Sequence, residues 1–158
     1  MTPLGALEAS AIGAAMRDVP WLFAAVKAAH LAGIATLAGS IAVLDLRLLG
    51  FRRSIPVRRL AWRVLPWTAA SFLLIVPSGL AMFAARAAEL IASPVFALKI
   101  CLILAAGTNA GIFHAGAFRG AAQWDVDLMP PPAARTAAAV SLALWVSVIA
   151  CGRTLASA

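Results

Sequence analysis

The chain has 158 residues, of which 63% are hydrophobic and only 12% carry a charge. Its mean hydropathy is +0.95. Soluble domains are nearer half apolar and a quarter charged, so this composition excludes an ordinary water-soluble globular protein. The formal net charge of +7 does not indicate nucleic-acid binding, because the basic residues gather where a membrane topology requires them. We therefore predict a single integral membrane domain over residues 1–158, in contact with a lipid bilayer.

Residues 3–17 carry apolar side chains at helical spacing, with polar side chains between them. This pattern predicts a short helix that lies along the membrane interface rather than crossing it. Four apolar segments follow, each close to the roughly 20 residues that a bilayer requires of a helix. They run from about Trp21 to Leu46, from Leu65 to Ala85, from Val95 to Phe118 and from Ala133 to Cys151.

The ends of these segments carry helix signals. Ser93 followed by Pro94 is typical of a helix start, and Gly152 is typical of a helix end. The expected fold is therefore all-α, a bundle of four transmembrane helices with a short interfacial helix at the N-terminus. Tryptophan favours membrane interfaces, and four of the tryptophans fall near predicted span ends. These are Trp21, Trp62, Trp67 and Trp124.

The arginines predict the orientation. Six of them lie around the connection between the first two spans, and two more flank the connection between the last two. The first group is Arg47, Arg52, Arg53, Arg58, Arg59 and Arg63, and the second is Arg119 and Arg135. Because positively charged loops stay in the cytoplasm, both termini are expected on the opposite side of the membrane, facing the periplasm or the exterior.

The only two histidines, His30 and His114, each lie inside an apolar span. A polar imidazole is costly in hydrocarbon, and binding to a metal or to haem b is a common reason for placing one there. The alternative is ordinary helix packing, with His30 hydrogen-bonded to a neighbouring helix.

Two further side chains are candidates for the same chemistry. Lys99, early in the third span, is either a lysine that extends to the interface or a cation that pairs with a carboxylate such as a haem propionate. Met82, late in the second span, is either a core-filling residue or a second axial ligand.

The segment Val26-Lys27-Ala28-Ala29-His30, with Leu44-Asp45-Leu46-Arg47-Leu48-Leu49 after it, resembles the first helix of the HemJ-type protoporphyrinogen IX oxidases and CopD-like membrane proteins. The resemblance implies a small four-helix membrane protein. It also implies a haem b bound by His30, with a functional Lys99. An electron-transfer or oxidoreductase role would follow, with a quinone, a tetrapyrrole or a periplasmic redox protein as partner.

Helix geometry separates the two histidines. At about 1.5 Å per residue, counting from Lys27 and Lys99 places His30 and His114 roughly 18 Å apart in depth. Three arrangements fit the sequence: one outer haem on His30, two haems near opposite surfaces, or one haem shared through helix tilt.

A different class of protein also fits the sequence, a non-enzymatic component for copper handling or complex assembly. There His30, Met82 and Met16 would form a soft metal site, in a homo-oligomer or as a complex subunit.

Overall fold

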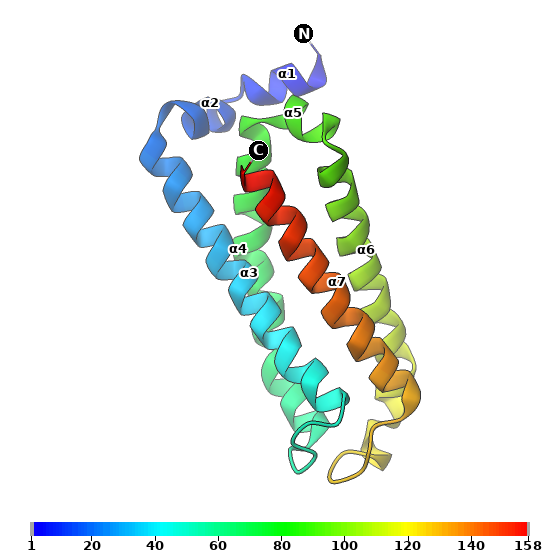
Figure 1. Cartoon of the computed structure of the whole chain (residues 1–158). Helices are drawn as coiled ribbons and strands as arrows, with labels where there is room; N and C mark the ends of the chain where they lie inside the picture. Colours follow the sequence, from blue (N-terminus) through cyan, green and yellow to red (C-terminus); the bar gives the residue numbers. More distant parts are fainter. Residues whose placement is uncertain (1, 158) are drawn as a thin grey trace.

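Four long helices dominate the computed structural model, which describes residues 2–157, and every regular element in this range is helical. Each of the four is long and apolar enough to cross a membrane. They are α3 (Pro20–Leu48), α4 (Val57–Ala85), α6 (Pro94–Ala115) and α7 (Pro132–Ser157). They run side by side as a bundle (Figure 1). The predicted all-α class with four spans is confirmed, and the chain is a multi-pass membrane protein.

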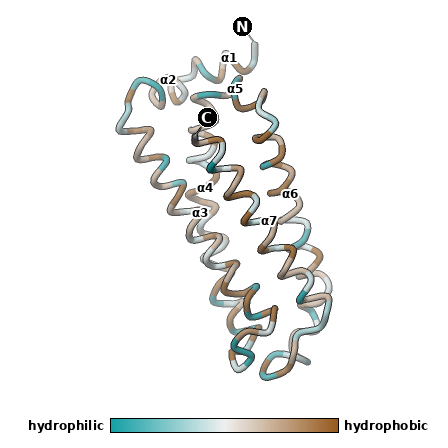
Figure 2. Tube along the Cα trace, viewed as in Figure 1, coloured by the Kyte–Doolittle hydropathy of each residue, from teal (hydrophilic) through white to brown (hydrophobic). Residues whose placement is uncertain are grey.

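The polar residues mark the two ends of this bundle, and the apolar residues follow the long helices between them (Figure 2). One end, here called the arginine-rich end, carries residues 49–56 and 116–131 with the first turns of α4. The other end carries both chain termini and three short helices (Figure 1). It is called the capped end, and its short helices are α1 (Pro3–Glu8), α2 (Ala11–Asp18) and α5 (Ala87–Ala92).

Several helix boundaries differ from the sequence prediction. α4 begins at Val57 rather than near Leu65, because arginine is a good helix former and does not end a helix when hydropathy falls. α6 ends at Ala115, and the chain continues as a 3-10 helix, η1 (Ala117–Gln123). Gly152 does not end α7, which continues to Ser157.

The predicted N-terminal helix is two helices, because Ser10 starts a new one. The Ser10 hydroxyl accepts a hydrogen bond from the Gly13 backbone N–H at 3.2 Å, which is the usual N-cap arrangement. Arg17 then fastens the short helices to the bundle. Its guanidinium donates to the Glu8 carbonyl at 2.7 Å and to the Ala85 carbonyl at 3.3 Å. These contacts hold α1 and α2 across the capped end.

The bundle consists of two hairpins, α3 with α4 and α6 with α7. Gly33 allows α3 to approach α4 closely, because a Cβ at this position would lie 2.8 Å from the Ile75 Cγ1 atom. In the second hairpin, the Asn109 amide donates to the Ala137 carbonyl at 2.9 Å. The backbones of the two hairpins approach through α3 and α7. No Cα atom of α4 comes within 8 Å of one in α6, and these two helices touch through the stacked rings of Phe83 and Phe96, whose centroids are 5.7 Å apart.

The main hydrophobic core lies at the arginine-rich end. It consists of Leu44, Leu48, Val57, Ala61, Phe113, Ala121, Trp124, Ala134 and Ala138. Trp124 is only 8% exposed, so the prediction that it belongs to an interfacial belt is wrong. Its position directly after η1 turns it back under α4 and α7, where it fills the core. Trp21, Trp62 and Trp67 are exposed at the bundle surface, as residues facing lipid are.

Arg47 joins the connections at this end. Its side chain is among the most deeply buried of the protein, with 2% exposed. The guanidinium donates to the carbonyl of Ile55 at 2.7 Å, and to those of Arg53 and Asp125 at 3.0 Å each. We call this group the Arg47 clamp. The sequence grouped Arg47 with the loop arginines, yet it is a structural residue that ties two connections far apart in the sequence.

Neighbouring bonds complete the clamp. The Asp125 carboxylate accepts from the Arg58 backbone N–H at 2.8 Å, and the Asp125 carbonyl accepts from the Val57 N–H at 3.1 Å. These bonds satisfy free N–H groups in the first turn of α4, where negative charge is also favourable. The Asp127 N–H donates to the Arg53 carbonyl at 2.8 Å. The start of α4 is therefore fixed by the connection that precedes α7.

We predict that replacing Arg47 with methionine will destabilise the protein by about 3 kcal/mol, because three inward-facing carbonyls lose their donors. Arg135→Met provides the matched control, since Arg135 is exposed at the same end and the charge change is identical. Thermal unfolding in detergent, followed by circular dichroism, measures the difference. Equal unfolding temperatures for the two variants would show that the clamp contributes nothing.

A second prediction concerns the cap. A Cβ at Gly13 would lie 2.6 Å from the Glu8 carbonyl oxygen and 2.8 Å from that of Ala84, so Gly13→Ala must displace α2 from α4. We expect a loss of about 1–3 kcal/mol. Gly39→Ala is the control, because that position meets no atom within 4 Å and alanine favours the helix by up to about 1 kcal/mol. Detergent unfolding temperatures should fall for the first and hold or rise for the second.

Candidate functional site

His30 lies in the capped half of α3, ten residues after Pro20 and hence roughly 15 Å along the helix. Its imidazole is half-buried and faces α4. The Nδ1 atom lies 2.9 Å from the Ser78 hydroxyl oxygen. Ser78 is itself 8% exposed, so the contact is shielded within the α3–α4 hairpin. The predicted packing alternative, a hydrogen bond from His30 to a neighbouring helix, is therefore present.

The bonds of Ser78 determine which ring nitrogen carries the proton. The Ser78 hydroxyl donates its single hydrogen to backbone carbonyls one turn earlier, those of Leu74 and Ile75. With that hydrogen used, the oxygen must accept from His30, so Nδ1 carries the N–H. In the neutral imidazole, the lone pair then lies on Nε2. A hydrogen bond that fixes the other ring nitrogen is what metal-binding histidines commonly have.

Gly79 provides the space for this ring. A Cβ at position 79 would lie 3.2 Å from the His30 Cε1 atom and 3.7 Å from Nδ1. Any side chain there would press on the imidazole and shift it from Ser78. The neighbouring pair Ser78 and Gly79 therefore both orients the ring and admits it against the backbone of α4.

Lys99 comes from the opposite hairpin. Its ammonium extends from α6 towards α7, where its Nζ atom would lie 3.8 Å from a Cβ built on Gly152. It lies close enough to interact electrostatically with the His30 imidazole and with the Cys151 thiol. Among residues 2–157, no hydrogen bond or ion pair neutralises this half-buried cation. The bundle thus holds an unpaired positive charge beside an oriented imidazole.

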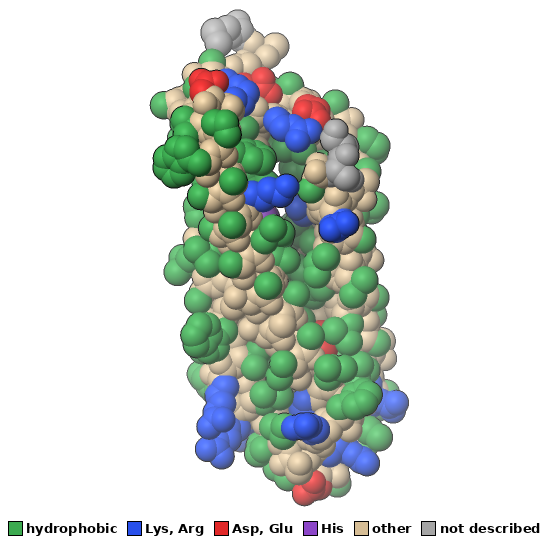
Figure 3. All heavy atoms as spheres, turned by 60° about the vertical axis from the view of Figure 1, so that its left-hand side comes forward, with side chains coloured by type: hydrophobic (Ala, Val, Ile, Leu, Met, Phe, Trp, Pro, Cys, Tyr) green, Lys and Arg blue, Asp and Glu red, His purple; other side chains and the backbone are tan. Residues whose placement is uncertain are grey.

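We call this group the His30–Lys99 site and define it as His30, Ser78, Gly79, Lys99 and Gly152. It lies between the two hairpins, in the capped half of the bundle. The space-filling view shows a hollow in this half of the face, with basic side chains around it and a histidine visible inside (Figure 3).

The other predicted ligands lie differently. Met82 is half-buried one turn after Ser78 on α4, so it shares the face that carries the serine. His114 lies about 30 Å along α6, at the arginine-rich end. Its ring packs edge-on against Phe113 at 5.2 Å and Phe118 at 5.0 Å, measured between centroids. The structure therefore brings His30 and Lys99 together but does not bring His114 to them.

Met16, the third residue of the predicted soft metal site, is 3% exposed within the packing of α2 at the capped end. In residues 2–157, no three side chains among His, Cys, Asp and Glu are grouped closely enough to hold a metal ion. The donors of the His30–Lys99 site are thus one imidazole and one cation, which do not form a metal site made of protein ligands alone.

Two polar residues of the bundle were given no functional role from the sequence, Ser78 beside an expected kink at Pro77 and Asp45 at an expected interface. Ser78 has a detectable signal, because Pro77-Ser78-Gly79 is a small polar interruption in an apolar span. Asp45 also has a detectable sequence signal, since a carboxylate inside an apolar span is costly. It is 6% exposed, hydrogen-bonds Ser141 on α7, and leaves its Oδ2 atom without a partner. Ser78 was interpreted only as a neighbour of the proline, and Asp45 only as an interfacial residue beside a cluster of arginines.

Fold and site together define a four-helix, multi-pass membrane protein with one oriented histidine and one unpaired lysine between its hairpins. A family model matches residues 7–158, so the chain belongs to the family described as "Family of unknown function (DUF6644)". No curated protein and no solved structure matches the chain.

The unpaired cation leads to a prediction about stability. We expect Lys99→Met to raise the stability of the ligand-free protein by about 1 kcal/mol, because an unpaired polar group is costly when buried. Lys27→Met removes a lysine near the same end and serves as the control. Unfolding temperatures in detergent measure both. A lower temperature for Lys99→Met would mean that the ammonium already has a stabilising partner.

Proposed function

We propose that this chain is a haem b protein of the bacterial inner membrane with an electron-transfer role, and that its haem is bound at the His30–Lys99 site. One observation carries the proposal: the His30 imidazole is oriented through Nδ1, beside a half-buried ammonium that has no counter-ion. A haem presents the complementary groups, an iron that accepts an imidazole and carboxylates that accept a cation.

Each residue of the site has a distinct role in this proposal. His30 would bind the haem iron, and Ser78 is a positioning residue that holds the ring through Nδ1. Lys99 would pair with a haem carboxylate, and Gly79 keeps the backbone of α4 clear of the ring. The haem supplies one-electron chemistry, while burial and ligand identity set its potential. The resemblance of the first span to haem-binding membrane oxidases indicates the same two residues, His30 and Lys99.

The proposed orientation determines which partners reach the haem. If the arginine-rich end faces the cytoplasm, the His30–Lys99 site lies in the periplasmic half of the membrane. A quinone within the bilayer, a tetrapyrrole or a periplasmic redox protein could then exchange electrons with it. A copper-handling role has less support, because the described residues place only one nitrogen ligand at this site and Met16 lies elsewhere.

The test compares three alanine variants of the full chain, purified from haem-replete cells. We expect the unchanged protein to show a Soret band that sharpens on reduction. His30→Ala should lose most of its haem, and Ser78→Ala should bind haem roughly 10- to 100-fold more weakly, as expected when a partner that orients a ligand is removed. His114→Ala is the matched histidine control and should keep its full haem content.

Three outcomes would contradict the proposal. A colourless unchanged protein would exclude haem, and full haem content in His30→Ala would place the ligand elsewhere. Loss of half the haem in His114→Ala would replace the single-haem arrangement with one haem at each end. Circular dichroism of each variant separates haem loss from loss of the fold.

A further inference from the structure

A groove runs between α3 and α4 at the arginine-rich end, far from the His30–Lys99 site. It consists of two adjoining depressions of about 280 and 410 Å³. Ile55 and Leu60 line both of them and form the wall between the two parts. The larger depression alone falls within the roughly 300–1,000 Å³ that ligand sites occupy.

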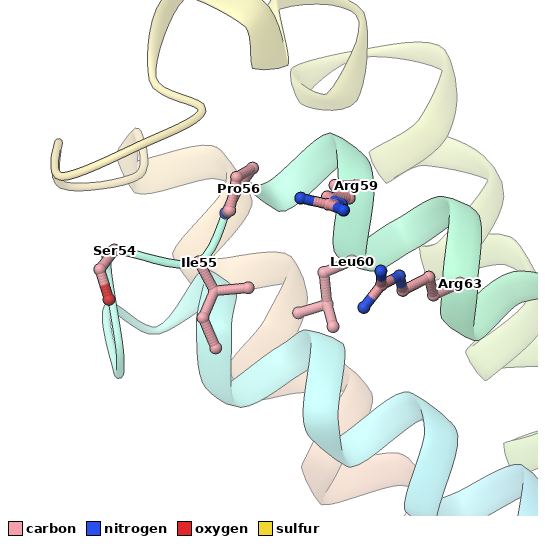
Figure 4. Close-up of a pocket in the computed structure, with 6 residues that line it drawn as sticks. All are labelled: Ser54, Ile55, Pro56, Arg59, Leu60 and Arg63. Carbon is pink, nitrogen blue, oxygen red and sulfur yellow. The ribbon is translucent and has the colours of Figure 1, made fainter.

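The smaller depression is basic. Arg59 and Arg63 lie one helical turn apart on α4, and their guanidinium groups extend on the side of Leu60 (Figure 4). Both side chains are exposed, and no acidic residue lines either depression. Among residues 2–157, the only ion pair joins Arg86 to Glu89 at the capped end, so Arg59 and Arg63 have no carboxylate partner. Two neighbouring guanidinium groups without counter-ions fit a phosphate, which each can bind with two parallel hydrogen bonds.

The larger depression is apolar and faces the bilayer. Its wall is formed by side chains near the end of α3, with Val43 50% exposed, Leu46 43% and Phe51 64%. Arg52 also lines it, at the boundary with water. A basic part and an apolar part therefore adjoin where the apolar spans α3 and α4 are joined.

The Arg47 clamp keeps this groove in shape. It binds the carbonyls of Ile55 and Arg53, which belong to the connection that forms the groove wall. The same connection contains two residues in the left-handed region, Gly50 at φ 104° and Arg52 at φ 48°. An arginine in that conformation is strained and persists only where its surroundings fix it. The groove is therefore preformed rather than assembled by a ligand.

We propose that this groove is a binding site for an anionic phospholipid, with the phosphate between Arg59 and Arg63 and an acyl chain along Val43, Leu46 and Phe51. The juxtaposition of charge and apolar surface selects this occupant. A soluble phosphate compound would use the basic half alone, whereas a zwitterionic lipid would offset its phosphate with its own cation. Basic pockets between helices near the membrane surface are suited to anionic headgroups.

The test measures lipid retained by the full-length protein in mixed micelles that contain phosphatidylglycerol and phosphatidylcholine. Native mass spectrometry counts the bound lipids across a titration. We expect the unchanged protein to retain phosphatidylglycerol in preference, and Arg59→Gln with Arg63→Gln to weaken that retention roughly tenfold. The matched control, Arg119→Gln with Arg135→Gln, removes two exposed charges from the same end outside the groove and should leave retention within about twofold.

Two further measurements identify the ligand and control for unfolding of the variants. Arg59→Lys with Arg63→Lys keeps the charge and should retain most of the binding, so a loss confined to the glutamine pair cannot be ascribed to misfolding. Inorganic phosphate at millimolar concentration should not displace the lipid. Displacement by phosphate would overturn the lipid assignment, and an equal loss in the Arg119 and Arg135 control would reduce the effect to general surface charge. Equal retention of the two lipids by the unchanged protein would overturn the site itself.

Discussion

The fold depends on the burial of one arginine at the end of the first span. Arg47 leaves water only because three carbonyls, from Arg53, Ile55 and Asp125, receive its hydrogen bonds. A buried guanidinium without such partners would be prohibitively costly. The two connections at this end must therefore bend so that their carbonyls face the Arg47 guanidinium. In this bent form they fix where α4 begins and how the second hairpin approaches the first.

The two ends of the bundle are held together by different contacts. The core cluster, Trp124 and the Arg47 clamp all lie at one end, and there the two hairpins are held together. Towards the capped end α4 and α6 touch through the stacked rings of Phe83 and Phe96, and the short helices close the bundle from outside. A side chain such as Lys99 can extend from α6 into this region without meeting a partner. The two proposals lie at different ends, with the proposed haem in the capped half and the proposed lipid at the arginine-rich end.

The sequence predicted the parts of this architecture that depend on composition and spacing. Spans of about twenty apolar residues can only be helices in a bilayer, so their number and order followed directly. His30 and Lys99 were recognisable because polar groups in hydrocarbon stand out. Trp124 and Arg47 were assigned to the interface, because composition reports that a residue is amphipathic or charged but not which way the chain turns after η1 or after α3. Asp45 was also placed at the interface, since its Ser141 partner comes from a helix almost a hundred residues later.

What the sequence determined by itself is the class of the protein, its four spans and the identity of the polar residues within them. These follow from local free energies of transfer, which each segment carries wherever it is placed. The tertiary structure alone decided which of those residues meet. It joined His30 to Ser78, brought Lys99 towards them without a counter-ion, and left His114 against two phenylalanines. Such contacts depend on how helices from different parts of the chain pack, which no single segment encodes.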